Sequence, residues 1–149
     1  MLNLITNYLT NNYKNYLLIA LIGIAAQNIN GKTIHSELQI KPGSDNYMSL
    51  AMQNAENRIR LRKINVIIID EISMVSKNLL DFINKIFCEL HNCALPFGGI
   101  MVLLVRDLAQ LPPINAPFVF KSILWDLFIP LFLSTPRRQS EDIEFFEIL

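Results

Sequence analysis

The chain has 149 residues, which is about the length of one domain. Hydrophobic residues make up 52% of it and charged residues 17%, a composition that provides a buried core and excludes an intrinsically disordered chain. The 13 basic and 13 acidic residues give a net charge of zero. Dedicated nucleic-acid-binding modules usually carry a basic excess, so charge argues against such a module, unless the basic surface lies in parts outside this sequence.

The apolar runs are short. The longest, residues 16–26 and 100–105, contain fewer than the roughly 18–20 residues that a bilayer-spanning helix needs, so we expect no membrane partner. Lys14 and the small residues up to Ala26 also imitate a signal peptide. We prefer a folded segment there, because the residues that follow fit a motif pattern described below.

Short apolar runs alternate with helical patterns along the chain, which predicts an α/β fold around a mostly parallel sheet flanked by helices. In the first half we expect, in chain order, the end of a helix over residues 4–9, a strand over 16–22, a short helix over 33–40, a loop over 42–46 and a helix over 48–60. Residues 66–69 are Val and Ile only, which is typical of a strand buried on both faces.

The second half begins with a helix for which Ser76 is a suitable N-cap. Its apolar residues recur at spacings of three and four: Leu79, Leu80, Ile83, Ile86, Phe87 and Leu90. After it we expect a break over 96–99, a strand over 100–105, an irregular segment over 111–113, a short strand over 131–133 and a helix from 141. We assign Trp125 and the phenylalanines around it to the core and not to base stacking.

Two predicted strands end at acidic residues. Asp70 and Glu71 follow the strand over 66–69, and Asp107 follows the strand over 100–105. Ligands of open parallel sheets bind outside the carboxyl ends of the strands. A nucleotide-hydrolysing motor uses an Asp-Glu pair there, the first acid to orient magnesium and the second to polarise the attacking water. Taken alone, a capping or solvated acid pair explains the pattern equally well.

Longer motifs occur around these acids in a fixed order. In chain order they are Gly23-Ile24-Ala25-Ala26, Asn28-Ile29, Gly31-Lys32-Thr33, His35-Ser36, Asp70-Glu71-Ile72-Ser73-Met74-Val75, Pro96-Phe97-Gly98-Gly99, Asp107-Leu108-Ala109-Gln110-Leu111-Pro112-Pro113, and Arg138-Gln139 with Asp142 and Phe145. This ordered set covers nearly the whole chain. It resembles motifs Ia to IV of the Pif-type (petite integration frequency) DNA helicases, a branch of helicase superfamily one.

The resemblance implies an incomplete P-loop NTPase (RecA-like) domain, with residues 1–149 forming part of the first helicase motor domain, truncated at both ends. It implies an ATP-dependent DNA helicase that moves five-prime to three-prime and serves DNA repair, recombination and telomere maintenance. The implied cofactors are ATP and Mg²⁺, and the implied partner is single-stranded DNA. The implied location is the nucleus, with the mitochondrion as an alternative.

The resemblance also implies roles for single residues at the nucleotide. Asp70 would hold the magnesium shell through water, and Glu71 would activate the attacking water. Gln110 would sense the γ-phosphate, and Arg138 would contact it. Two of these residues have simpler alternatives, because Gln110 could hydrogen-bond a turn and Arg138 could be a surface arginine beside Arg137.

Three further residues are implied in DNA binding. By the same resemblance, Gly23, Thr33 and His35 would lie along the single strand. For His35 the simpler alternative is a local hydrogen bond at the start of a helix.

The chain departs from the family pattern in three places. It contains no Gly-x-x-x-x-Gly-Lys-Ser/Thr loop, which would supply the phosphate-binding N–H groups, a lysine and a magnesium ligand. Motif Ia lacks its threonine, since Ile22 precedes Gly23. Arg106 stands where the family has glycine, and it either occupies the γ-phosphate space beside Asp107 or Asp70 or points to solvent.

From these departures we expect no ATP turnover by this chain alone. Two alternatives to a helicase motor stay open. One is a non-catalytic nucleic-acid- or protein-binding remnant of a helicase or rolling-circle transposon. The other is a truncated gene product without a stable role.

Overall fold

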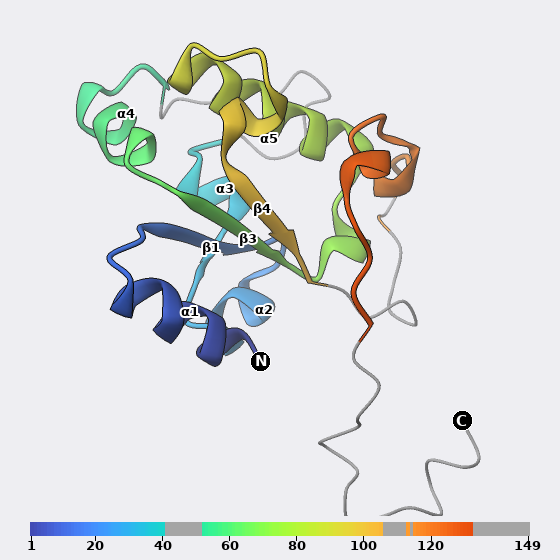
Figure 1. Ribbon diagram of the computed structural model, residues 1–149. Coiled ribbons are helices and arrows are strands. Elements are labelled where there is room, and N and C mark those ends of the chain that lie inside the picture. The colour runs from blue at the N-terminus through green and yellow to red at the C-terminus, as the bar shows by residue number, and fades with distance from the viewer. Residues whose placement is uncertain (41–51, 106–112, 114, 133–149) are drawn as a thin grey trace, which may run out of the picture.

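The computed structural model describes residues 1–40, 52–105, 113 and 115–132 (Figure 1). In this part of the chain four parallel strands form one sheet in the order β2-β1-β3-β4. Their bounds are Tyr16–Ala20 for β1, Lys32–Thr33 for β2, Val66–Asp70 for β3 and Met101–Leu104 for β4. The predicted α/β fold with a parallel sheet is confirmed.

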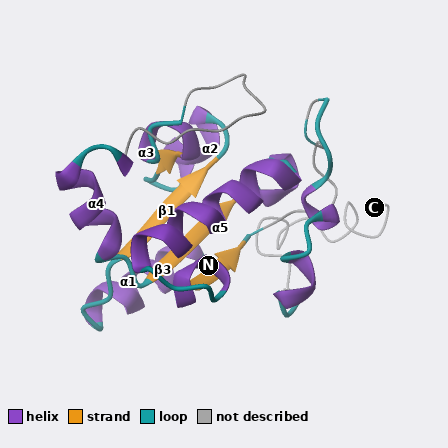
Figure 2. Cartoon of the chain, turned by 90° about the horizontal axis from the view of Figure 1, so that it is seen from above, coloured by secondary structure: helices purple, strands orange, loops and turns teal. Residues whose placement is uncertain are grey.

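Helices cover both faces of the sheet. On one face lie α1 (Leu2–Asn11) and α2 (Gly23–Asn28), and on the other lie α3 (Ile34–Glu37), α4 (Ala55–Arg62) and α5 (Lys77–His91) (Figures 1 and 2). Side chains of β3 alternate between the two faces, as the period of two in a strand requires. Ile67 and Ile69 join the α5 cluster, and Val66 and Ile68 join the α1 cluster. Burial on both faces explains why this strand contains only Val and Ile before Asp70.

Helix α5 agrees with its predicted pattern. The Leu79 backbone N–H donates to Ser76 Oγ at 3.2 Å, so Ser76 is the N-cap. All six predicted apolar residues of this helix are buried. The helix ends at Asn92, whose φ of 49° is in the left-handed region that often follows a helix. This helix and β3 together contribute ten of the 27 buried hydrophobic residues of the described structure.

Several element boundaries differ from the predictions. Strand β1 ends at Ala20, because the chain turns into α2 at Gly23. The helix predicted over 33–40 is only the single turn α3. The helix predicted over 48–60 corresponds to α4, which begins at Ala55 because Asn54 Oδ1 caps it by accepting from the N–H groups of Glu56 and Asn57. Some predicted elements lie wholly or partly outside the described residues. They are the loop over 42–46, the first part of the helix over 48–60 (48–51), most of the irregular segment over 111–113 (111–112), the last residue of the strand over 131–133 and the helix from 141.

The C-terminal part of the described chain corrects two predictions. Leu131 and Phe132 are in no strand and are exposed, because an apolar run specifies a strand only where a partner strand is available. Phe118 and Phe120 are also exposed, and their rings stack on each other with centroids 5.0 Å apart. Val119, between them, takes the core position, while Trp125 and Phe128 pack at the edge of the core as predicted.

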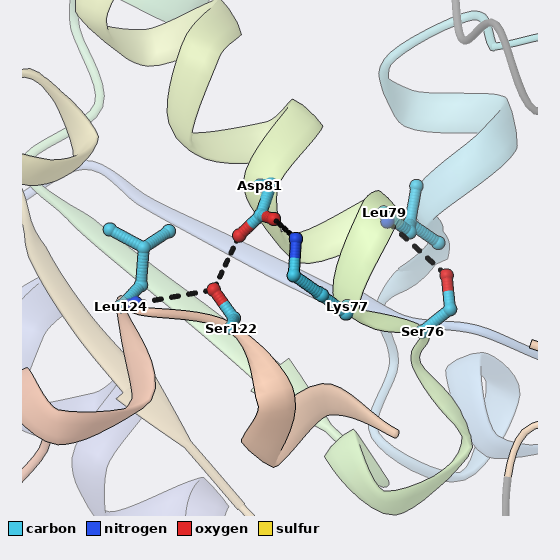
Figure 3. A network of polar contacts seen from close by, with 6 residues as sticks. All are labelled: Ser76, Lys77, Leu79, Asp81, Ser122 and Leu124. Atoms are coloured by element: carbon cyan, nitrogen blue, oxygen red, sulfur yellow. Dashed lines mark hydrogen bonds and ion pairs between the residues drawn. The ribbon is translucent and has the colours of Figure 1, made fainter. Parts of the chain in front are cut away.

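A polar network attaches this C-terminal segment to α5 (Figure 3). The Ser122 hydroxyl donates to Asp81, Lys77 Nζ lies 2.7 Å from the other carboxylate oxygen, and the Leu124 N–H donates to Ser122 Oγ at 3.2 Å. The Lys77 backbone N–H adds a bond of 2.9 Å to Pro117 O. Because Ser122 is buried, its hydroxyl needs such a partner, and the network fixes the segment on the start of α5.

Within the described part of the chain, no helix has the length and apolar character needed to cross a membrane. The residues that imitate the apolar part of a signal peptide form β1, which pairs with β2 on one side and β3 on the other.

Gly98 provides a test of the packing beneath α5. It has a φ of +68°, and a Cβ atom there would lie 2.4 Å from Phe87 O. Gly98→Ala should therefore lower the free energy of unfolding by about 1–3 kcal/mol in urea denaturation, because both strain and a backbone clash must be relieved. The control is Gly23→Ala, since no atom lies within 4 Å of a Cβ atom at that position. Equal stability of Gly98→Ala and the parent chain would contradict the described packing.

Candidate functional site

One row of residues crosses the carboxyl edge of the sheet. Ala20 at the end of β1 is the register partner of Thr33 in β2 and of Asp70 in β3. Neighbouring strands lie about 4.8 Å apart, so the backbones of Thr33 and Asp70 are separated by roughly 10 Å. Gly23 starts α2 just beyond β1, and His35 lies in α3 just beyond β2. The structure thus brings the described candidate residues to one edge.

Asp70 is the last residue of β3 and is partly buried behind three fully buried isoleucines. This burial raises the pKa of the Asp70 carboxyl, and a hydrogen bond from the Glu71 backbone opposes the rise in pKa. A carboxylate whose charge is poorly solvated gains from a nearby cation. Magnesium is commonly held by one or two carboxylates together with waters and phosphates, so the acids at this position suit such an ion.

Glu71 follows with φ 52° and ψ 48°, in the left-handed region that a residue with a side chain enters at a cost of about 1–2 kcal/mol. Hydrogen bonds hold the backbone on both sides of it. Val105 N–H donates to Ile69 O at 2.8 Å, and Ile72 N–H donates to Val105 O at 3.1 Å. Strained residues of this kind cluster at functional sites. Glu71 lies where the chain leaves the sheet, which suits a residue that must reach a ligand beyond the edge.

Ser73 was named only as part of a motif and was given no role from the sequence. It lies in the short 3₁₀ helix Ile72–Met74, its side chain is buried, and its Oγ has no hydrogen-bond partner in the described structure. A buried hydroxyl without a partner costs about 1–3 kcal/mol. The burial of Ser73 and its missing partner are visible only in the structure, whereas the sequence shows only its place in the motif of residues 70–75. An unsatisfied polar atom directly after the acids is a further sign of a binding site at this edge.

Thr33 and His35 lie at the other end of the row. The Ser36 N–H donates to Thr33 Oγ1 at 3.2 Å, so Thr33 is the N-cap of α3, while its own hydroxyl proton can still be donated to a ligand. Burial lowers the pKa of His35, which is half-buried, and so favours its neutral imidazole. A neutral imidazole can donate one hydrogen bond to a phosphate or a base without bringing a charge.

Gly23 is exposed at the start of α2. Neither a positive φ nor a neighbouring atom requires a glycine there. The fold therefore does not explain this residue, whereas close approach of a ligand would.

Gln110 and Arg138 lie outside the described residues, as do Arg106 and Asp107, so their roles stay predictions. No group of three or more His, Cys, Asp or Glu residues in the described structure is arranged to hold a metal ion. A magnesium site here would therefore depend on Asp70 with water and nucleotide, as the sequence analysis predicts.

Comparison with known proteins identifies the family. The family model of the PIF1-like helicase matches residues 1–144. The chain belongs to the PIF1-like helicase family. It is 34% identical over 147 residues to the ATP-dependent DNA helicase PIF1 of Saccharomyces cerevisiae, covering 91% of this chain and 17% of that protein.

Solved Pif1 structures agree with this assignment. The crystal structure of Pif1 helicase from Candida albicans matches with a TM-score of 0.82 and 32% identity, over 99% of this chain and 35% of that one. A Bacteroides Pif1 helicase in complex with ADP-AlF3 and ssDNA matches with a TM-score of 0.62 and 31% identity, over 74% of this chain and 29% of that one. The predicted incomplete RecA-like domain is confirmed as a fold, and the chain spans about a third or less of these PIF1-like proteins.

The raised pKa of Asp70 predicts a gain in stability when its charge is removed. The folded state disfavours the ionised carboxyl, so the cost is fully present at neutral pH and disappears as the pH falls through the raised pKa. Asp70→Asn should thus increase the free energy of unfolding at pH 7 in EDTA, and the increase should shrink toward pH 4. The control is Asp126→Asn, at an exposed acid. A lower stability of Asp70→Asn at pH 7 would contradict this account.

Proposed function

We propose that this chain is part of the motor of an ATP-dependent DNA helicase, with its acids facing the nucleotide and its motif Ia segment facing the single strand. The observation that supports this proposal most is the Thr33–Ala20–Asp70 row. Residues that the resemblance assigns to the nucleotide and residues that it assigns to DNA are separated in this row by the single strand β1.

The chemistry of the proposal rests on Asp70 and Glu71. Bound magnesium would neutralise phosphate charge and polarise the γ-phosphate. Asp70 would hold the water shell of the ion, since its carboxylate ends a rigid buried strand. Glu71, one residue further, would accept a hydrogen bond from the attacking water and orient it. The proposed partners of these two acids at the γ-phosphate are Gln110 and Arg138.

The same geometry suggests how nucleotide and DNA would be coupled. Strand β1 pairs with β3 over five residue pairs and with β2 over two. A shift of the edge at Asp70 would therefore act on Thr33 through backbone hydrogen bonds of one strand. Nucleotide binding at Asp70 and DNA binding at Thr33 would then be coupled through the sheet itself, without a flexible segment between them.

Names of related proteins support the cofactors and the partner. The yeast relative is an ATP-dependent DNA helicase, and the Bacteroides structure holds ADP-AlF3 and ssDNA. Binding of ATP, Mg²⁺ and single-stranded DNA by this chain is part of our proposal, as is a nuclear or mitochondrial location. ATP turnover is expected only together with a phosphate-binding loop, because the 149 residues contain none.

A second candidate function is protein binding without catalysis. It is favoured by the exposed apolar residues of the C-terminal described segment, which are Ile123, Leu127, Ile129, Leu131 and Phe132. Such an apolar surface is typical of a contact with another protein segment. A protein-binding remnant would retain this surface without needing the residues of the carboxyl edge.

Binding of fluorescent oligo-dT, measured by anisotropy, separates the two candidates. Gly23→Leu should weaken binding about tenfold, because the side chain occupies the space left open beside the backbone, while thermal stability stays unchanged. His35→Ala should weaken binding about threefold by removing one donor. Asn7→Leu, a similar change at an exposed position of α1, is the control. Equal affinity of all four proteins, or no binding by the parent chain, would contradict the proposal.

A further inference from the structure

A buried carboxylate lies next to the predicted DNA-binding segment. Only 4% of the Glu37 side chain is exposed. Its Oε2 lies 3.1 Å from Lys32 Nζ, and its Oε1 accepts a hydrogen bond from Arg60 Nη1. Burying an unpaired carboxylate would be costly, so each oxygen is matched with a cation. We name this arrangement of Lys32, Glu37 and Arg60 the Glu37 triad.

The two cations of the triad remain accessible. The exposed fraction is 68% for the Lys32 side chain and 44% for the Arg60 side chain. An ammonium group has three N–H donors and a guanidinium group has five, and Glu37 takes one contact from each. The triad has a net charge of +1. Its anion is below the surface and its free donors are at the surface, which is an arrangement suited to a second, external anion.

The location of the triad favours a phosphate group of DNA as that anion. Lys32 directly precedes Thr33 in β2, and Glu37 follows His35 in α3, so both belong to the segment that carries the proposed DNA contacts. Arg60 comes from α4 and reaches the same point. The inference requires that the single strand that passes Thr33 brings a phosphate group to these two cations. Because the chain as a whole has no basic excess, phosphate binding requires such a local concentration of positive charge.

We infer that Lys32 and Arg60, held in place by Glu37, bind a backbone phosphate of the single strand beside Thr33 and His35. This inference rests on the proposed function and adds a contact to the same site. The competing explanation is that the triad only ties α3 to α4. The two explanations differ in the salt dependence of DNA binding, since each lost phosphate contact reduces the number of ions released.

The test measures oligo-dT affinity between about 50 and 200 mM salt. Lys32→Gln and Arg60→Gln should each weaken binding and lower the slope of log K against log salt by about 0.7 in magnitude, the value per phosphate on a single strand. Arg60→Lys keeps the charge and should keep the slope. The control for Arg60→Gln is Arg58→Gln, because a position two residues earlier in α4 points about 200° away around the helix. Lys85→Gln on α5 is the control for Lys32→Gln.

Equal slopes for Arg60→Gln and Arg58→Gln, with Lys32→Gln like Lys85→Gln, would overturn the inference. Melting curves establish that each variant is folded. If Arg60→Gln does not fold, the salt slope of Lys32→Gln decides between the two explanations, because Arg60 still neutralises the Glu37 carboxylate in that variant. If the parent chain does not bind oligo-dT, the proposed function fails; if it binds in a His35-dependent way and the slopes do not change, only the triad inference fails.

Discussion

The parallel pairing of β1 between β2 and β3 is the constraint on which the rest of the structure depends. It fixes Ala20 opposite Thr33 on one side and Asp70 on the other. A slip of the register by one residue would turn every side chain of a strand to the opposite face. The alternating burial of Ile67, Ile68 and Ile69 against two different clusters therefore also fixes where Asp70 stands. Core packing and site geometry have the same origin.

Three features at the carboxyl edge reduce stability. Asp70 ionises in partly buried surroundings, Glu71 adopts a left-handed conformation, and the Ser73 hydroxyl is buried without a partner in the described structure. They lie within the four residues 70–73, at the end of the most thoroughly buried strand. The apolar side chains of β3 and α5 in the core beneath them are buried. Such a concentration of unfavourable features is expected where a site is held ready for a ligand.

Periodic elements were predictable from the sequence, and long-range contacts were not. The α5 helix and β3 followed from apolar spacing and from the composition of residues 66–69. The row across the edge did not, because spacing within one segment contains no information on register between segments. Glu37 was missed, since a glutamate in a short polar helix is usually solvated, and only Lys32 and Arg60 explain its burial. Phe118 and Phe120 were assigned to the core because composition cannot tell which of the neighbouring apolar residues faces inward.

The central proposal is that the part of the carboxyl edge around Gly23, Thr33 and His35 binds single-stranded DNA. Titration of the isotope-labelled chain with oligo-dT, followed through its backbone amide resonances, tests this claim most directly. We expect the largest shifts at Gly23, Thr33 and His35, with smaller shifts at α1 and at the middle of α5. The largest shifts at α1 or at the exposed residues 123–132, with Gly23, Thr33 and His35 unchanged, would contradict the account.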